Sequence, residues 1–158
     1  MDLAGEKAMM MSTTGAEKIR EKIIQRRGNE LLQRLDGLEA GALAKASDYD
    51  LSWHMAIAKE NSAFKSKSTL LFPIDNFFEA ICENFEKFTE KYEGELLIQY
   101  EKPFILKVDI RESKSFMHSL YKEQNTKDLV IFKIHPDAIF EVQELEYNIK
   151  LFIIEKSI

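Results

Sequence analysis

Residues 75–92, with the sequence DNFFEAICENFEKFTEKY, show the clearest structural pattern in this chain. Apolar side chains recur every three or four residues, the spacing of one helix face. They are Phe77, Phe78, Ile81, Cys82, Phe85, Phe88 and Tyr92. The opposite face carries Glu79, Glu83, Glu86 and Glu90. Asp75 is the expected N-cap and Gly94 the expected C-terminal stop. The pattern predicts an amphipathic helix that packs its phenylalanine face against a sheet.

The segments around this helix predict strands and a second helix. Alternating or continuous apolar runs predict strands at 68–74, 96–100, 104–111, 129–135 and 144–155. Residues 113–124 read as a helix, and residues 136–143 as a transition. The order from 68 to 135 is compatible with a ferredoxin-like split βαβ unit, followed by an extra C-terminal strand. We therefore predict an α+β fold in which two helices cover one face of an antiparallel sheet.

Residues 49–57 carry two competing patterns. Apolar and polar side chains alternate from Tyr49 to Ile57, as in a strand. Residues 56–60 have high helix propensity, however, and Asp48 is a suitable N-cap. We favour a helix for this stretch.

The first 48 residues differ in composition from the rest of the chain. All aromatic residues lie at or after Tyr49, whereas five of the six glycines and four of the five arginines precede it. We expect residues 1–48 to form a flexible terminus (1–14) and an amphipathic helical arm (16–45), and residues 49–158 to form a compact α+β domain. The arm has a heptad-like apolar seam at Ile24, Leu31, Leu35, Leu38 and Ala42, and Ile19 and Ile23 are expected on the same face.

The overall composition excludes several classes of protein. The chain has 158 residues and a formal net charge of −5, with 45% hydrophobic residues, which is typical of one globular domain. Cys82 is the single cysteine, so an intrachain disulfide and a cysteine zinc site are excluded. We find no signal peptide, no apolar run of membrane-spanning length and no phosphate-loop or nucleophile-elbow motif. We therefore expect a cytoplasmic protein without a cofactor or metal.

The leading functional hypothesis is a non-catalytic protein–protein interaction or assembly subunit. The seam of the arm has too little apolar surface to be stable alone, which favours a partner protein or a second copy of the chain. The acidic helix 75–92 is the second expected binding element. The candidate partner-binding residues are Ile24, Leu31, Leu35, Leu38, Glu79, Glu83, Glu86 and Glu90.

Three alternatives remain open from the sequence. A nucleic-acid-binding accessory protein would act through the basic stripe 18–27, whose candidate phosphate contacts are Lys18, Arg20, Lys22, Arg26 and Arg27. A metal-assisted hydrolase would combine Asp109 and Glu112 with one of the isolated histidines, which are His54, His118 and His135. An immunity or antitoxin-type inhibitor would place helix 75–92 on a basic toxin surface. No motif specifies a reaction.

Overall fold

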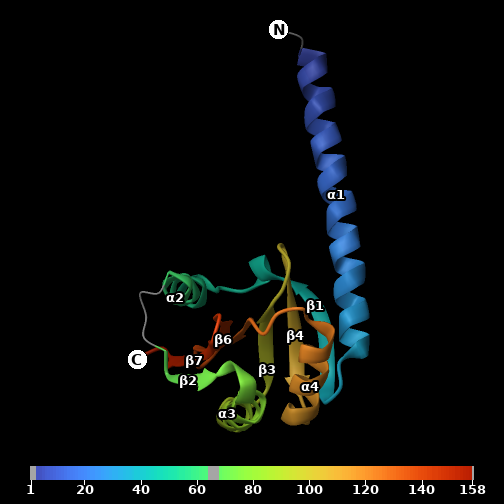
Figure 1. Cartoon of the computed structure of the whole chain (residues 1–158). Helices are drawn as coiled ribbons and strands as arrows, with labels where there is room; N and C mark the ends of the chain where they lie inside the picture. The colour runs from blue at the N-terminus through green and yellow to red at the C-terminus, as the bar shows by residue number, and fades with distance from the viewer. Residues whose placement is uncertain (1–2, 64–67, 158) are drawn as a thin grey trace.

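The computed structural model describes residues 3–63 and 68–157. Within these ranges the chain forms one seven-stranded sheet in which all neighbouring strands are antiparallel (Figure 1). The strand order across the sheet is β1-β4-β3-β5-β6-β7-β2. The strands are β1 (Leu38–Lys45), β2 (Leu70–Pro73), β3 (Glu95–Gln99), β4 (Phe104–Ile110), β5 (Leu129–Lys133), β6 (Ala138–Glu144) and β7 (Asn148–Glu155).

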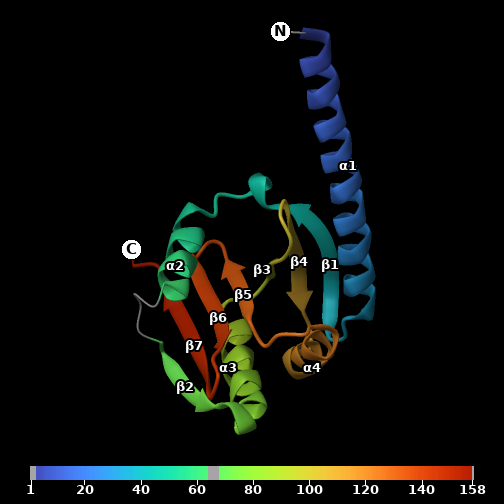
Figure 2. The same cartoon turned by 45° about the horizontal axis from the view of Figure 1, so that its top comes forward.

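Helices cover both faces of this sheet. Figure 1 shows α3 and α4 on one face and α2 on the other. The long helix α1 lies beside β1, and its N-terminal part projects away from the rest of the molecule (Figures 1 and 2). The helices are α1 (Leu3–Arg34), α2 (Ser52–Ser62), α3 (Phe78–Lys91) and α4 (Ser113–Glu123), with short 3-10 turns at η1 (Ala46–Asp48) and η2 (Ile74–Asn76).

The larger hydrophobic core lies between the sheet and helices α3 and α4. The ring centroid of Phe85 on α3 is 5.7 Å from that of Phe116 on α4 and 5.3 Å from that of Phe140 on β6. The buried residues of α3 are Ile81, Cys82, Phe85 and Phe88. The predicted phenylalanine face is therefore the face that packs. Burial raises the pKa of the Cys82 thiol to about 11, so this thiol stays protonated and unreactive at neutral pH.

A smaller core lies under α2 on the opposite face of the sheet. Leu51, which precedes α2, and Ala58 of α2 belong to this core. The sheet contributes Leu97, Ile105, Phe132 and Ile139. The sheet thus has a larger hydrophobic core on the face covered by α3 and α4 and a smaller one on the face covered by α2.

The predicted α+β fold class is confirmed, but only half of the ferredoxin-like arrangement is present. A split βαβ unit places one strand between the two strands that its helix connects. Helix α4 does this, because it connects β4 and β5 with β3 between them. Helix α3, in contrast, connects β2 and β3, and these two strands are separated by β5, β6 and β7. The hairpin of β6 and β7 extends the sheet beyond β5, and β2 pairs at its far edge with β7.

The prediction for residues 136–155 is wrong in one respect. Residues 138–144 form strand β6, where we expected a transition, and the predicted single strand 144–155 begins instead at Asn148. The five residues from Ala138 to Val142 are all buried, because both faces of the sheet are covered here. Such a strand has no alternating pattern, and the turn into β7 contains neither glycine nor proline.

The predicted helical arm is also corrected. The helix begins at Leu3 and ends at Arg34, and residues 38–45 form strand β1, which pairs with β4. Leu38 and Ala42 therefore lie on a strand and not on a helical seam. Gly37 separates the two elements with a φ of +71°, and a Cβ at this position would collide with the Glu112 carbonyl oxygen. The alanine-rich composition of β1 favours a helix locally, but pairing with β4 prevails.

Two predicted helix caps are replaced by other contacts. Residues 52–62 form α2, as we favoured, but Asp48 lies in η1, and Asp50 accepts hydrogen bonds from the Ser52 backbone N–H and hydroxyl. Asp75 lies in η2, and α3 begins at Phe78 without a side-chain cap. Gly94 follows α3 with a φ of +97°, which agrees with the predicted stop.

In the described part of the chain, we find no helix that is both long and apolar enough to cross a lipid bilayer.

Candidate functional site

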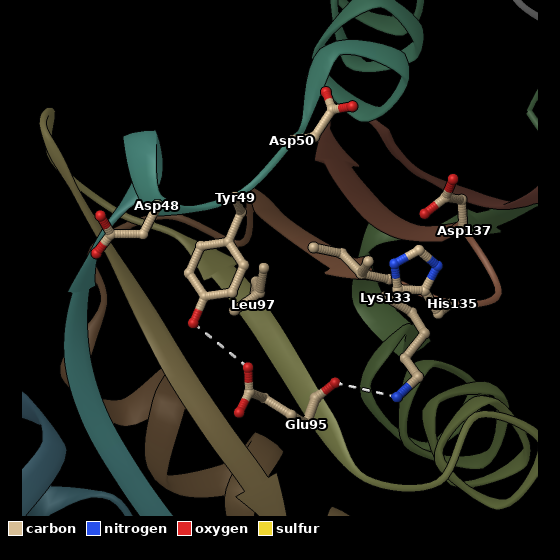
Figure 3. A pocket seen from close by; sticks show the side chains of 9 residues that line it. Asp48, Tyr49, Asp50, Glu95, Leu97, Lys133, His135 and Asp137 are labelled. Atoms are coloured by element: carbon tan, nitrogen blue, oxygen red, sulfur yellow. Dashed lines mark hydrogen bonds between the residues drawn. The ribbon is translucent and has the colours of Figure 1, made fainter.

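A pocket of about 470 Å³ lies on the α2 side of the sheet, where β3 begins and β5 ends (Figure 3). Three segments that are far apart in sequence form its wall. They are the link from η1 to α2, the first half of β3, and the turn from β5 to β6. The lining residues are Asp48, Tyr49, Asp50, Glu95, Leu97, Lys133, Ile134, His135 and Asp137.

Carboxylates dominate the polar lining of this pocket. Figure 3 shows the Tyr49 hydroxyl directed at the Glu95 carboxylate, to which it donates a hydrogen bond of 3.4 Å. Burial and the negative charge of Glu95 raise the pKa of Tyr49, so its hydroxyl remains a donor at neutral pH. The four carboxylates of Asp48, Asp50, Glu95 and Asp137 give the pocket a negative potential that favours cationic over anionic groups.

Lys133, the one lysine that lines this pocket, binds backbone carbonyl groups. Lys133 is buried, and its ammonium donates hydrogen bonds to the carbonyl oxygens of Glu93 (2.9 Å) and Glu95 (3.3 Å). These carbonyls lie just after α3, where a cation is also favoured by the helix dipole. Lys133 thus fixes the connection from α3 to β3, and Figure 3 shows its ammonium directed at the Glu95 carbonyl oxygen.

One isolated histidine lies next to this wall. His54 of α2 is only 1% exposed, and its Nε2 lies 2.8 Å from the Lys133 carbonyl oxygen and 3.6 Å from Asp137 Oδ1. The imidazole packs between the rings of Trp53 and Phe132, at centroid distances of 5.0 and 5.2 Å. Its role in this geometry is to fasten α2 to the end of β5.

The residues of the hydrolase hypothesis are dispersed. Within the described ranges, no group of three or more histidine, cysteine, aspartate and glutamate side chains is arranged to hold a metal ion. Asp109 lies in β4, and Glu112 lies before α4 and accepts a hydrogen bond from Ser115. His118 packs edge-on against the ring of Phe78. The structure therefore does not bring the residues of the hydrolase hypothesis together in the part of the chain that it describes.

The seam residues contact the chain's own sheet and core. Ile24 and Leu35 are buried, and Leu31 and Leu38 pack at the margin of the larger core. Gly28 lies between them where α1 closely approaches β1, because a Cβ there would lie 2.8 Å from Leu43 Cδ1. In this structure the apolar seam of α1 therefore packs against other residues of the same chain.

The candidate phosphate contacts on α1 are exposed. Arg27 forms an ion pair of 3.2 Å with Glu101 in the turn from β3 to β4. Lys18, Arg20, Lys22 and Arg26 are exposed around the helix. On α3 the predicted acidic residues Glu79, Glu83, Glu86 and Glu90 are exposed as well, and Glu79 pairs with Lys114 of α4 at 3.3 Å.

The structure corrects the predicted position of two isoleucines of α1. We expected Ile19 and Ile23 on the seam face, but they are 62% and 43% exposed, whereas the adjacent Ile24 is 1% exposed. Their spacing of four residues on a side of the helix distinct from Ile24, Leu31 and Leu35 was the available signal.

The pocket was also not predicted from the sequence. The local sequences 48–50 and 133–137 contain several ionisable residues, but they have no pattern that indicates their proximity to Glu95.

Comparison of the chain with models of protein families, with curated proteins and with solved structures gives no match.

Proposed function

We propose that this chain is a non-catalytic protein-interaction subunit, and that its binding element is the part of α1 that precedes Ile24. The observation that carries this proposal is the exposure of Ile19 and Ile23 beside a fully buried Ile24. The packing of α1 on the sheet stops at Ile24, and the helix continues beyond it to Leu3 without a sheet beneath it (Figure 2).

The energetics of an isolated helix support this proposal. Residues 3–23 span roughly 30 Å at the rise of an α-helix. A helix of this length is marginal in water unless its apolar side chains pack on something. A partner that covers Ile19 and Ile23 would supply that packing and remove two large apolar side chains from water.

The charges around the isoleucines indicate the chemistry of the partner. Lys18, Lys22 and Arg26 follow each other at intervals of four residues and are all exposed, so they form one basic stripe along the helix. This stripe lies next to Ile19 and Ile23 on the helix surface. We therefore expect a protein surface with an apolar groove and an acidic rim, which would bind the isoleucines in the groove.

The test compares two double variants of the full chain. Ile19→Glu/Ile23→Glu places two carboxylates on the proposed binding side, and Met55→Glu/Lys59→Glu places two carboxylates at the same spacing on the exposed side of α2. Each chain is used for affinity capture from its own host at matched concentration, and circular dichroism verifies that the helix content is unchanged.

We expect proteins that bind the natural chain and the Met55/Lys59 variant and that lose at least about tenfold in affinity for the Ile19/Ile23 variant. Lys22→Glu/Arg26→Glu should weaken the same binding, as should added salt. Light scattering on the same samples shows whether the partner is a second copy. Binding that survives Ile19→Glu/Ile23→Glu, or a chain that binds no protein, contradicts the proposal.

A further inference from the structure

Helix α2 is held to the sheet in a different way from α3. The buried residues of α3 are all apolar, whereas those of α2 are His54, Ala58 and Asn61. Two of the three buried side chains of α2 are thus polar, and Ala58 buries little apolar surface. Trp53 and Ile57 of α2 also pack against the smaller core, but they are only partly buried, whereas Ile81 and Phe85 of α3 are 0% exposed. Helix α2 therefore gains less packing energy from buried apolar surface than α3 does.

Each end of α2 is fastened by one buried hydrogen bond. Near the N-terminus, His54 Nε2 donates to the Lys133 carbonyl oxygen at 2.8 Å. Near the C-terminus, Asn61 Nδ2 donates to Glu141 Oε1 at 2.8 Å. These two contacts hold α2 across β5 and β6.

Both fastenings leave a polar atom without a partner. The Nδ1 atom of His54 and the Oδ1 atom of Asn61 are buried, and neither has a hydrogen-bond partner in the described part of the chain. Asn61 is 0% exposed. A buried polar atom that loses water without gaining a partner destabilises the closed arrangement, and release of α2 would hydrate both atoms.

The acceptor of the second fastening is a buried carboxyl group. Glu141 is 3% exposed, and its strand neighbours in the sheet are Val130 of β5 and Phe152 of β7. Its carboxyl group accepts hydrogen bonds from the amides of Asn61 and Gln143, and the negative charge of Asp128 also acts on it. Burial is the main cause that raises the pKa of Glu141, and Asp128 adds to it.

We propose that α2 is a releasable cover, which leaves the sheet as a unit while the core beneath α3 and α4 remains intact. Release uncovers part of the smaller core, to which Phe132 of β5 and Ile139 of β6 belong. The segment 46–51, which links β1 to α2, allows this movement without a change in the sheet. The cover is independent of the binding role proposed for α1.

The charge of Glu141 sets the direction of the pH dependence. The pKa of Glu141 is raised when α2 is closed and returns to its ordinary value when α2 is released. The closed state therefore binds the proton more tightly, and it is favoured at low pH. Its stability is lost as the pH rises through the raised pKa, so α2 opens more readily at neutral pH than at mildly acidic pH.

Hydrogen exchange followed by mass spectrometry on the full chain tests the proposal. Peptides from α2 and α3 are compared between pH 5 and pH 8, after correction for the intrinsic exchange rate. We expect α2 to exchange at least about tenfold faster than α3, and its protection to fall as the pH rises. Glu141→Gln, which mimics the protonated side chain, should raise the protection of α2 at pH 7 and remove its pH dependence. Glu146→Gln, at an exposed position in the turn after β6, is the matched control and should change neither.

A second variant keeps the proposal testable if Glu141→Gln does not fold. Asn61→Ala removes the fastening at the C-terminus of α2 and should lower the protection of α2 while α3 is unchanged. Equal exchange of α2 and α3 in the natural chain would overturn the proposal. A pH dependence that persists in Glu141→Gln, or an equal loss of protection in both helices of Asn61→Ala, would overturn it as well.

Discussion

At the scale of single residues, Gly28 shows how packing overrides local preference. Glycine weakens a helix interior by about 1 kcal/mol relative to alanine, so its position within the apolar seam was a weak point in the sequence. The structure explains it, because α1 approaches β1 so closely that a Cβ would lie 2.8 Å from Leu43 Cδ1 and 3.3 Å from Tyr100 Cε2. The glycine therefore gives up some helix stability for a close contact between α1 and the sheet.

A pair of glycine substitutions tests this account. We expect Gly28→Leu to lower the free energy of unfolding by about 1–3 kcal/mol, because the added side chain forces α1 away from Leu43 and Tyr100. Gly15→Ala is the control in the same helix, where nothing lies within 4 Å of an added Cβ. It should not destabilise the chain, and it should increase helix content through propensity. Urea unfolding and circular dichroism measure both effects. Equal stability of the two variants would contradict the close-packing account.

At the scale of elements, α1 has two structurally different parts. From Ile24 onward its apolar side chains pack against the sheet and α4, whereas Ile19 and Ile23, which precede Ile24, are exposed. Two ion pairs also belong to the part of α1 that follows Ile24. Arg27 pairs with Glu101, and Arg34 pairs with Glu123. The helix is therefore a structural element at one end and a projecting element at the other.

Alanine substitutions should separate these two parts. Ile24→Ala removes a fully buried side chain, and we expect it to lower the free energy of unfolding by about 2–5 kcal/mol. Ile19→Ala truncates the same residue type in the projecting part, and we expect a change within about 0.5 kcal/mol. Both values come from denaturant unfolding of the purified chain. A large destabilisation by Ile19→Ala would show that the projecting part contacts the body in solution.

The helices that could be predicted from sequence are those with one buried face. Helices α3 and α4 show a period that distinguishes a packed side from a solvated side. Strand β6 was missed because both of its faces are buried, and Glu141 interrupts its apolar run. Strand β1 was read as a helix because alanine and leucine favour a helix when no neighbouring strand is considered.

At the scale of the whole molecule, the order of the strands and the position of the pocket could not be derived from sequence. The pairing of β2 with β7 joins segments that are about 80 residues apart, and no local pattern specifies it. The pocket likewise combines Tyr49, Glu95 and Lys133, which meet only because β3 lies beside β5 and the link to α2 crosses above them (Figure 3). Long-range pairing is a property of the complete sheet and not of any segment.

The position of α1 beside β1 also has a consequence for solubility. A sheet with two free edges can add strands from other molecules and aggregate. Here β2 is short and ends in Pro73, which discourages strand addition, whereas β1 has eight residues and an uncharged centre from Ala40 to Ala44. Helix α1 runs along the outer side of β1 and hinders the approach of a foreign strand (Figures 1 and 2).

A chain that begins at Leu38 keeps this strand and loses its cover. We expect such a chain to form β-rich aggregates that bind thioflavin T, under conditions in which the full chain stays clear. Adding Ala42→Lys to the shortened chain should suppress them, because a charge at the centre of an edge strand opposes pairing. A shortened chain that remains as soluble as the full chain would contradict this role. Besides carrying the proposed binding side chains, α1 would then act as an intramolecular guard against self-templated assembly of the sheet.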